Sequence, residues 1–139
     1  MKILVDSCFW IALFTPGDQS HERALELVND FENNEVLIPW PTLYEFVNTK
    51  LARRKENLYS FQQFLQKPNV LKISDEIYKD NALQNVFKVN QTKTASVSLI
   101  DEVLRQMILD NSLKVDYFLT FNKSDFEYPC QIARILILD

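Results

Sequence analysis

The chain has 139 residues, of which 47% are hydrophobic and 24% charged, and these ordinary values predict one globular domain over residues 1–139. Its single glycine, Gly17, excludes the glycine-rich loops that cradle phosphates, both the P-loop and the dinucleotide fingerprint. The formal net charge of −4 excludes a surface that attracts nucleic acid as a whole, so any contact with a polyanion must come from a local basic patch.

The two cysteines, Cys8 and Cys130, lie far apart and have none of the spacings of a zinc site. We therefore expect a reducing, cytoplasmic compartment, and we expect Cys8 to be an ordinary core residue of its apolar run. The longest apolar stretch, at 8–14, is too short to cross a bilayer, and Asp6 interrupts any signal-peptide pattern. No membrane contact is expected.

Strands and helices are predicted to alternate along the chain. The run Ile3-Leu4-Val5 is continuously apolar, which is typical of a strand buried on both faces, and further strands are predicted at 36–38, 70–73, 117–121 and 135–138. Apolar residues at helical spacing predict helices at 20–31, 42–51, 57–67, 76–89 and 98–111. A short helix or turn is predicted at 9–14, a loop at 90–96, and a turn or helical start at 122–126. This alternation predicts a three-layer α/β/α sandwich with a mainly parallel central sheet, but not the strand order.

Polar residues follow these predicted strands. Asp6 comes directly after the first strand, and Glu45 lies on the helix after strand 36–38. Asp101 opens the helix that leads into strand 117–121, and Asn122 and Asp125 follow that strand. Because the carboxyl ends of parallel strands share one edge of the sheet with the helix starts, we expect all five side chains in one crevice.

Four carboxylates in one crevice need a cation to remain ionised. Like charges a few ångströms apart repel by roughly 4 kcal/mol per pair at an intermediate dielectric. Oxygen ligands without His or Cys favour hard cations such as Mg²⁺ or Mn²⁺, and such a site suits hydrolysis of a phosphodiester. The only histidine, His21, lies on a predicted surface helix, so we do not expect an imidazole base.

The acids also have a simpler interpretation as helix caps. Three of them stand third after a capping residue, in Thr42-Leu-Tyr-Glu45, Ser98-Leu-Ile-Asp101 and Asn122-Lys-Ser-Asp125. An acid in that position reaches back to the first free amide of its own helix. Both interpretations are open for each acid taken alone. Two other acids are not expected in the crevice. Asp116 precedes its strand and so belongs at the opposite edge of the sheet. Glu102 points about 100° away from Asp101 on a helix.

The order of these segments resembles the PIN domain, and especially the VapC-type toxins of bacterial and archaeal toxin–antitoxin pairs. The resemblance covers residues 3 to about 126 and rests on Ile-Leu-Val-Asp6-Ser7, Pro-Thr42-Leu-Tyr-Glu45-Phe, Ser98-Leu-Ile-Asp101 and Leu119-Thr120-Phe-Asn122-Lys-Ser-Asp125-Phe126. It implies a PIN-like fold and a ribonuclease dependent on Mg²⁺ or Mn²⁺, in which cleavage of single-stranded or structured RNA leaves a 5′-phosphate.

The resemblance also implies roles for single residues. Residues matching Asp6, Glu45 and Asp101 bind one or two metal ions, and a hydroxyl matching Ser7 or Thr120 supports them. The fourth position, commonly Asp, is Asn122 here. Asn122 adds no charge, so either Asp125 supplies the missing carboxylate or a second metal ion binds weakly.

Two further segments concern partners. The one basic cluster, at Lys50, Arg53, Arg54 and Lys55, either guides an RNA backbone toward the acids or is a solvated helix end. Phe61, Phe64 and Leu65 have the spacing of a groove for an amphipathic helix, as an antitoxin would supply, or of a simple core. We expect a homodimer with an antitoxin protein as partner.

The leading hypothesis is therefore a metal-dependent endoribonuclease, the toxin of a type II toxin–antitoxin pair. The alternative is a PIN-fold RNA-binding module with weakened catalysis, because Asn122 stands where the family commonly has Asp. A haloacid-dehalogenase-like phosphatase also carries an aspartate after its first strand, but it needs a second acid two residues later, where this chain has Cys8.

Overall fold

A computed structural model describes residues 1–94 and 96–139, and it confirms the α/β prediction. Within these residues, five strands form one parallel sheet in the order β3-β2-β1-β4-β5. Every predicted strand is present: β1 (Lys2–Val5), β2 (Glu35–Pro39), β3 (Val70–Ile73), β4 (Tyr117–Leu119) and β5 (Leu136–Leu138). The opening strand is the centre of the sheet, with Leu4 opposite Leu37 on one side and Phe118 on the other.

The predicted helices are also present, with shifted ends. They are α1 (Ser7–Leu13), α2 (His21–Leu27), α3 (Trp40–Val47), α4 (Lys55–Leu65), α5 (Lys79–Thr92), α6 (Leu99–Leu109) and α7 (Lys123–Ala133), with short 3-10 helices η1 (Val28–Asn33), η2 (Lys50–Arg53) and η3 (Asn111–Leu113). The predicted loop 90–96 is helical up to Thr92, and residue 95 lies outside the described residues.

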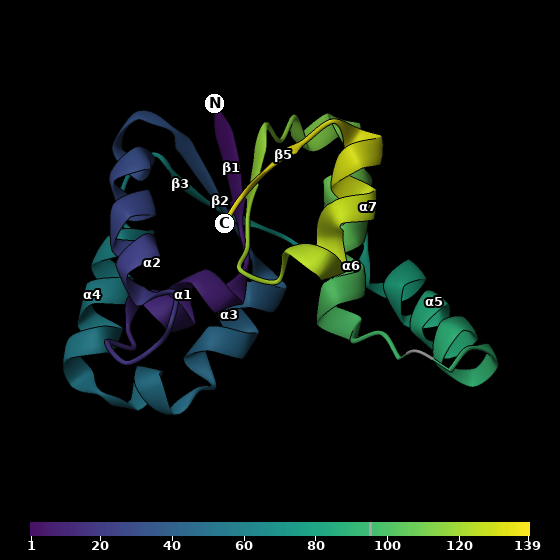
Figure 1. The fold of residues 1–139 in the computed structure, drawn as a ribbon, viewed down its shortest axis with the longest axis horizontal. Coiled ribbons are helices and arrows are strands. Elements are labelled where there is room, and N and C mark those ends of the chain that lie inside the picture. The colour runs from purple at the N-terminus through teal and green to yellow at the C-terminus, as the bar shows by residue number, and fades with distance from the viewer. Residues whose placement is uncertain (95) are drawn as a thin grey trace.

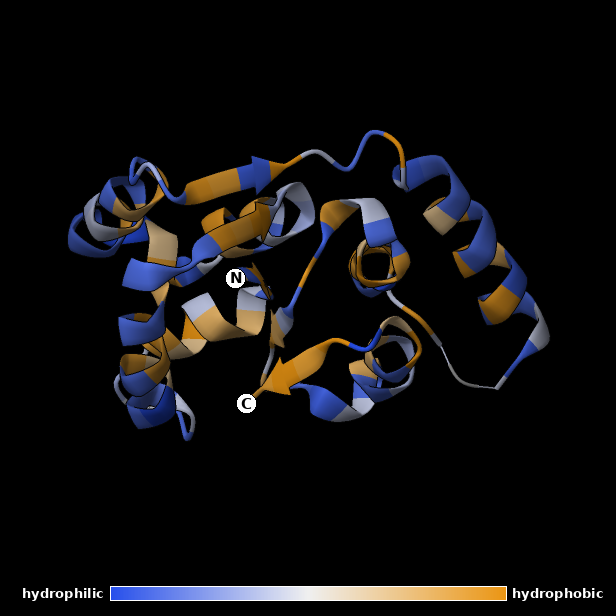
Figure 2. Ribbon diagram, turned by 90° about the horizontal axis from the view of Figure 1, so that it is seen from above, coloured by the Kyte–Doolittle hydropathy of each residue, from blue (hydrophilic) through white to orange (hydrophobic). Residues whose placement is uncertain are grey.

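Helices cover both faces of the sheet, which confirms the three-layer prediction (Figure 1). Successive residues of β1 point to opposite faces: Ile3 and Val5 pack with α1 to α4, and Leu4 packs with α5 to α7. Trp10 is fully buried in the first core, with ring centroids 5.1 Å from Phe61 and 5.0 Å from Phe64. Figure 2 shows hydrophobic residues along the strands and hydrophilic residues on the outlying parts of the helices.

The carboxyl ends of the strands meet at one edge of the sheet, where α1, α3 and α7 begin. The Asp6 amide donates to the Leu119 carbonyl at 3.0 Å, which joins the ends of β1 and β4. Asp116 lies at the opposite edge, as predicted, where its Oδ2 accepts from the Lys2 amide at 2.8 Å. None of the helices in the described part of the chain has both the length and the apolar character needed to cross a membrane.

Candidate functional site

Asp6 is a buried carboxylate held on both oxygens. Its side chain is the N-cap of α1 and only 3% of the residue is exposed. Oδ1 accepts from the Ser7 amide at 2.7 Å and from the Ser7 hydroxyl at 3.3 Å, and Oδ2 accepts from the Thr120 hydroxyl at 2.9 Å. Both hydroxyl residues expected beside the acids therefore contact Asp6, and its orientation is fixed before any ligand binds.

Cys8 also contacts Asp6, so the expectation of an ordinary core residue is wrong. Its Sγ donates to Asp6 Oδ2 at 3.3 Å, lies 3.5 Å from Thr120 Oγ1, and accepts from the Phe121 amide at 3.2 Å. The side chain is partly exposed. An apolar run does not separate a core position from a position at the sheet edge. The sequence clue was the placement of Cys8 two residues after Asp6, in the first turn of α1.

Both cysteines are expected to react slowly with iodoacetamide in the folded protein. Burial, followed by the charge of Asp6, raises the pKa of the Cys8 thiol to about 12, and burial raises the pKa of Cys130 to about 11. Because the thiolate is the nucleophile, we expect alkylation near pH 8 to be roughly a hundredfold slower, or more, than in urea. Mass spectrometry after timed quenching measures the rates, and equal rates in the folded and unfolded chains would contradict the prediction.

The charge of Asp6 acts on both Glu45 and Asp101, and the charge of Asp101 acts on Glu45. Burial raises the pKa of Glu45, a hydrogen bond with the Ser7 hydroxyl lowers it, and the charges of Asp6 and Asp101 raise it further. Burial also raises the pKa of Asp101, which Ser98 and Arg105 lower and Asp6 and Asp125 raise. These electrostatic effects are consistent with Asp6, Glu45 and Asp101 facing the same edge of the sheet, although the three side chains do not form a preformed metal site within the described residues.

Of the three predicted capping boxes, only Ser98–Asp101 is formed in part, because among the described residues the Ser98 amide makes no bond to the Asp101 carboxylate. Ser98 caps α6, with its hydroxyl accepting from the Asp101 amide at 3.0 Å. Thr42 does not begin a helix, because α3 already starts at Trp40, a start that Pro41 in the first turn favours. The buried Thr42 hydroxyl instead donates to the Val5 carbonyl at 3.3 Å and fastens α3 to the end of β1.

Asn122 and Asp125 form the exposed rim of the cluster. Asn122 is at the N-cap position of α7 without a side-chain capping bond, and its amide donates to the Thr120 hydroxyl at 3.0 Å. That hydroxyl therefore links the start of α7 to Asp6. The charge of Asp125 acts on Asp101, so this residue lies on the α6 side of the cluster.

Comparisons with known proteins place this fold. No protein-family model matches the sequence, and no curated protein matches it. VapC20 of Mycobacterium tuberculosis, a toxin that cleaves the sarcin-ricin loop, superposes with a TM-score of 0.66 at 19% identity, over 91% of this chain and 94% of its own. This chain has the PIN-domain fold of VapC. A chain of VapBC2 from Rickettsia felis, whose structure was solved bound to a DNA fragment from their promoter, superposes with a TM-score of 0.62 at 15% identity. The match covers 99% of this chain and 98% of the VapBC2 chain.

The donor chemistry of this VapC fold suits a hard divalent cation. Carboxylates are the ligands that Mg²⁺ and Mn²⁺ prefer, and a cation would relieve the repulsion that adds to the effect of burial in raising the pKa values of Glu45 and Asp101. Across residues 1–94 and 96–139, no three His, Cys, Asp or Glu side chains stand close enough to hold a metal ion as they lie. Glu45 and Asp101 are partly exposed, which allows their side chains to turn toward Asp6.

Other polar residues singled out in the sequence lie in different surroundings. Glu102 is buried, and its Oε1 accepts from Asn85 Nδ2 at 2.7 Å, so it faces α5. His21 is partly buried rather than simply exposed, and its Nδ1 lies 2.8 Å from the Ala12 carbonyl. The basic cluster lies on η2 and the start of α4, where its four members are exposed and form no ion pair within the described residues.

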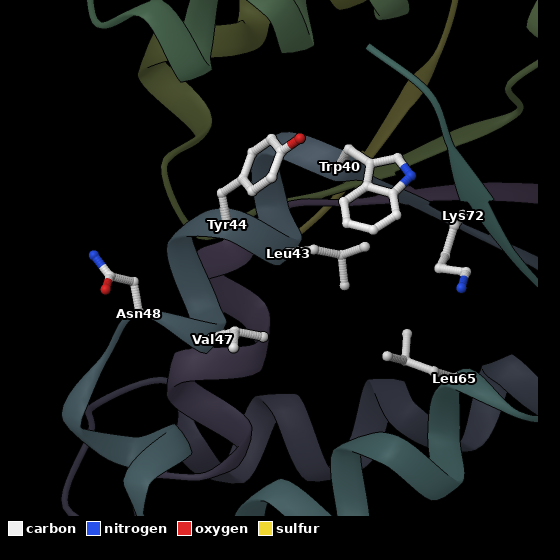
Figure 3. Close-up of a pocket in the computed structure, with 7 residues that line it drawn as sticks. All are labelled: Trp40, Leu43, Tyr44, Val47, Asn48, Leu65 and Lys72. Carbon is white, nitrogen blue, oxygen red and sulfur yellow. The ribbon is translucent and has the colours of Figure 1, made fainter.

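A second surface of the VapC fold is an apolar groove of about 650 Å³ between α3, the end of α4 and β3 (Figure 3). It is lined by Trp40, Leu43, Tyr44, Val47, Asn48, Leu65 and Lys72. Of the three residues predicted to form a groove, Leu65 lines this one, whereas Phe61 and Phe64 pack in the core. Trp40, Tyr44 and Val47 were missed, although their spacing marks one face of a helix.

Proposed function

We propose that this chain is a metal-dependent endoribonuclease and the toxin half of a type II toxin–antitoxin pair. The observation that carries the proposal is the group of acids at the end of the central strand: burial raises the pKa values of Glu45 and Asp101, and the charge of the buried Asp6 raises both further. Such repulsion costs folding free energy unless a ligand compensates it. Acids with raised pKa values in one place are also typical of catalytic sites.

In this proposal each acid has a defined task. Asp6, Glu45 and Asp101 would hold Mg²⁺ or Mn²⁺, which when bound supplies a Lewis acid for the phosphodiester and its attacking water. Ser7 and Thr120 hold the two oxygens of Asp6, so this carboxylate needs no reorganisation when substrate arrives. Asn122 and Asp125 complete the rim from α7.

RNA binding is assigned to the basic cluster at Lys50, Arg53, Arg54 and Lys55. These cations are exposed, and within the described residues they are not engaged in ion pairs, so they are available to phosphates. Phosphate contacts supply most nonspecific affinity for nucleic acid. They offset a net charge of −4 that would otherwise repel RNA.

The partner is proposed to be an antitoxin whose amphipathic segment fills the α3–α4 groove. The groove is mainly apolar, and Trp40, Tyr44 and Val47 remain 38%, 60% and 51% exposed. Apolar side chains grouped in this way are typical of a surface that a partner helix covers. The superposition with VapBC2 supports a paired partner. Homodimer formation stays a prediction.

A second candidate function is an RNA-binding module with weakened catalysis. Two observations favour it: Asn122 lacks the charge of the expected fourth acid, and the described acids do not converge into a preformed metal cluster. The phosphatase alternative has no such support, since the position two residues after Asp6 holds a thiol that donates to Asp6.

Incubation of the purified chain with single-stranded and stem-loop RNA tests the proposal. We expect cleavage in Mn²⁺ or Mg²⁺ and none in EDTA, because the acids need a cation to act on a phosphodiester. Gel electrophoresis detects the products, and a 5′-phosphate-dependent exonuclease identifies their ends. Tight RNA binding without turnover in Mn²⁺ would contradict the ribonuclease and favour the binding module.

A further inference from the structure

A backbone carbonyl in the first turn of α7 lacks its helical donor. Pro129 lies inside this helix, and proline has no N–H to give to the carbonyl four residues earlier, which is that of Asp125. Arg105 of α6 fills the gap from outside the helix: its Nε and Nη2 donate to the Asp125 carbonyl at 3.3 and 3.1 Å. An arginine on one helix thus replaces the donor that a proline removes from another.

The guanidinium of Arg105 is itself held in place. Only 24% of its side chain is exposed, its Nη1 lies 3.6 Å from Glu102 Oε2, and it stands 5.6 Å above the ring of Phe126. Glu102 is fixed in turn by Asn85 at 2.7 Å. A planar fork with this many contacts has one orientation, which a flexible ammonium would not reproduce.

Arg105 lies one helical turn after Asp101, and the carbonyl it holds belongs to the turn that carries Asn122 and Asp125. We propose that Arg105 is a positioning residue of the candidate site, which uses the carbonyl freed by Pro129 to set the start of α7 against Asp101. The inference rests on the proposed ribonuclease function and adds to it. It assigns to Arg105 and Pro129 one joint task that neither performs alone.

A double-mutant cycle tests this joint task. Arg105→Lys keeps the charge but loses the fork, and we expect it to lower kcat for RNA cleavage about tenfold while KM for RNA stays within about twofold. Pro129→Ala restores an N–H that can reach the Asp125 carbonyl within the helix. In that background, Arg105→Lys is expected to lower kcat by no more than about twofold.

Arg23→Lys is the matched control. Arg23 has the same kinds of contact, with Nε donating to the Asp139 carbonyl at 2.9 Å and Nη1 2.9 Å from Glu26, but it acts on none of the site acids. We expect its kcat to be unchanged. If Arg105→Lys leaves kcat unchanged, or lowers it equally in both backgrounds, the joint task is refuted, because Pro129→Ala would not rescue an ordinary structural loss.

Hydrogen exchange separates this inference from the proposed function. If the unsubstituted protein cleaves no RNA, the ribonuclease proposal fails, but the amides of residues 126–128 still report the order of the first turn of α7. We expect Arg105→Lys to speed their exchange about tenfold, Pro129→Ala to restore it, and Arg23→Lys to leave it unchanged. Unaltered exchange in Arg105→Lys would overturn the positioning role whatever the activity.

Discussion

Asp6→Asn is expected to lower metal-stimulated RNA cleavage roughly a thousandfold. A metal ion contributes several kcal/mol of charge stabilisation in the transition state, and each 1.36 kcal/mol is a factor of ten in rate. The amide keeps the size of the carboxylate and can still accept from the Ser7 amide, so the fold is expected to survive. Single-turnover cleavage of a labelled RNA, together with circular dichroism, measures the two effects separately.

Asp116→Asn is the control for this substitution. Asp116 is also an aspartate at a strand end, but it lies at the opposite edge, where it accepts from the Lys2 amide at 2.8 Å. We expect its cleavage rate to stay within about twofold of the unsubstituted protein, because it is remote from the reacting groups. A folded Asp6→Asn protein that cleaves as fast as Asp116→Asn would remove Asp6 from the mechanism.

Mn²⁺ is expected to raise the Tm by about 6–11 °C near pH 7 and by much less near pH 5. An ion that binds only the folded state at about 100 times its Kd adds about 2.7 kcal/mol, and each kcal/mol corresponds to about 2–4 °C for a chain of this size. Protons compete with the ion, since Glu45 and Asp101 both have raised pKa values. Thermal unfolding in Mn²⁺ and in EDTA across this pH range measures the difference.

The sign of the pH dependence follows from the direction of these shifts. The folded state binds protons at Glu45 and Asp101 more tightly than the unfolded chain does, because their pKa values lie above the ordinary 4.5 and 3.8. Without metal, their contribution to stability is complete below those ordinary values and is lost as the pH rises through the raised values. Bound metal favours the ionised carboxylates and removes this loss, so the gap between the two Tm curves should widen with pH.

Glu45→Gln separates the metal effect from general salt effects. It removes one of the mutually repelling charges, so we expect a higher Tm in EDTA at neutral pH and little response to Mn²⁺. Glu22→Gln, on an exposed turn of α2, should leave both values unchanged. A Mn²⁺ response of full size in Glu45→Gln would show that the ion binds elsewhere.

The sequence was sufficient for the strands and for the acids that follow them. Ile3-Leu4-Val5 predicted a strand buried on both faces, and the ends of parallel strands must share an edge, so Asp6, Glu45 and Asp101 could be grouped from the order of residues alone. These inferences need only local patterns and one topological rule.

The features that were missed depend on how distant segments meet. Cys8 looked like core because an apolar run carries no information about the sheet edge. Thr42 was interpreted as a helix cap, but its hydroxyl donates to the Val5 carbonyl at the end of β1. The pairing of Arg105 with the carbonyl freed by Pro129 requires the packing of α6 on α7, which hydrophobic spacing alone does not determine.

Because β1 is the central strand, the proposed site has one rigidly held acid, Asp6, and two acids whose positions can shift, Glu45 and Asp101. Asp6 continues a strand that is hydrogen-bonded on both sides, so displacing it means breaking the sheet, whereas Glu45 and Asp101 are carried by helices that can shift by small amounts. In the proposed metal site, the affinity for a cation would then depend on helix packing. The Asn85–Glu102 contact joins α5 to α6, the helix that carries Asp101. Changing this contact would therefore alter the position of Asp101 without removing any of the three acids.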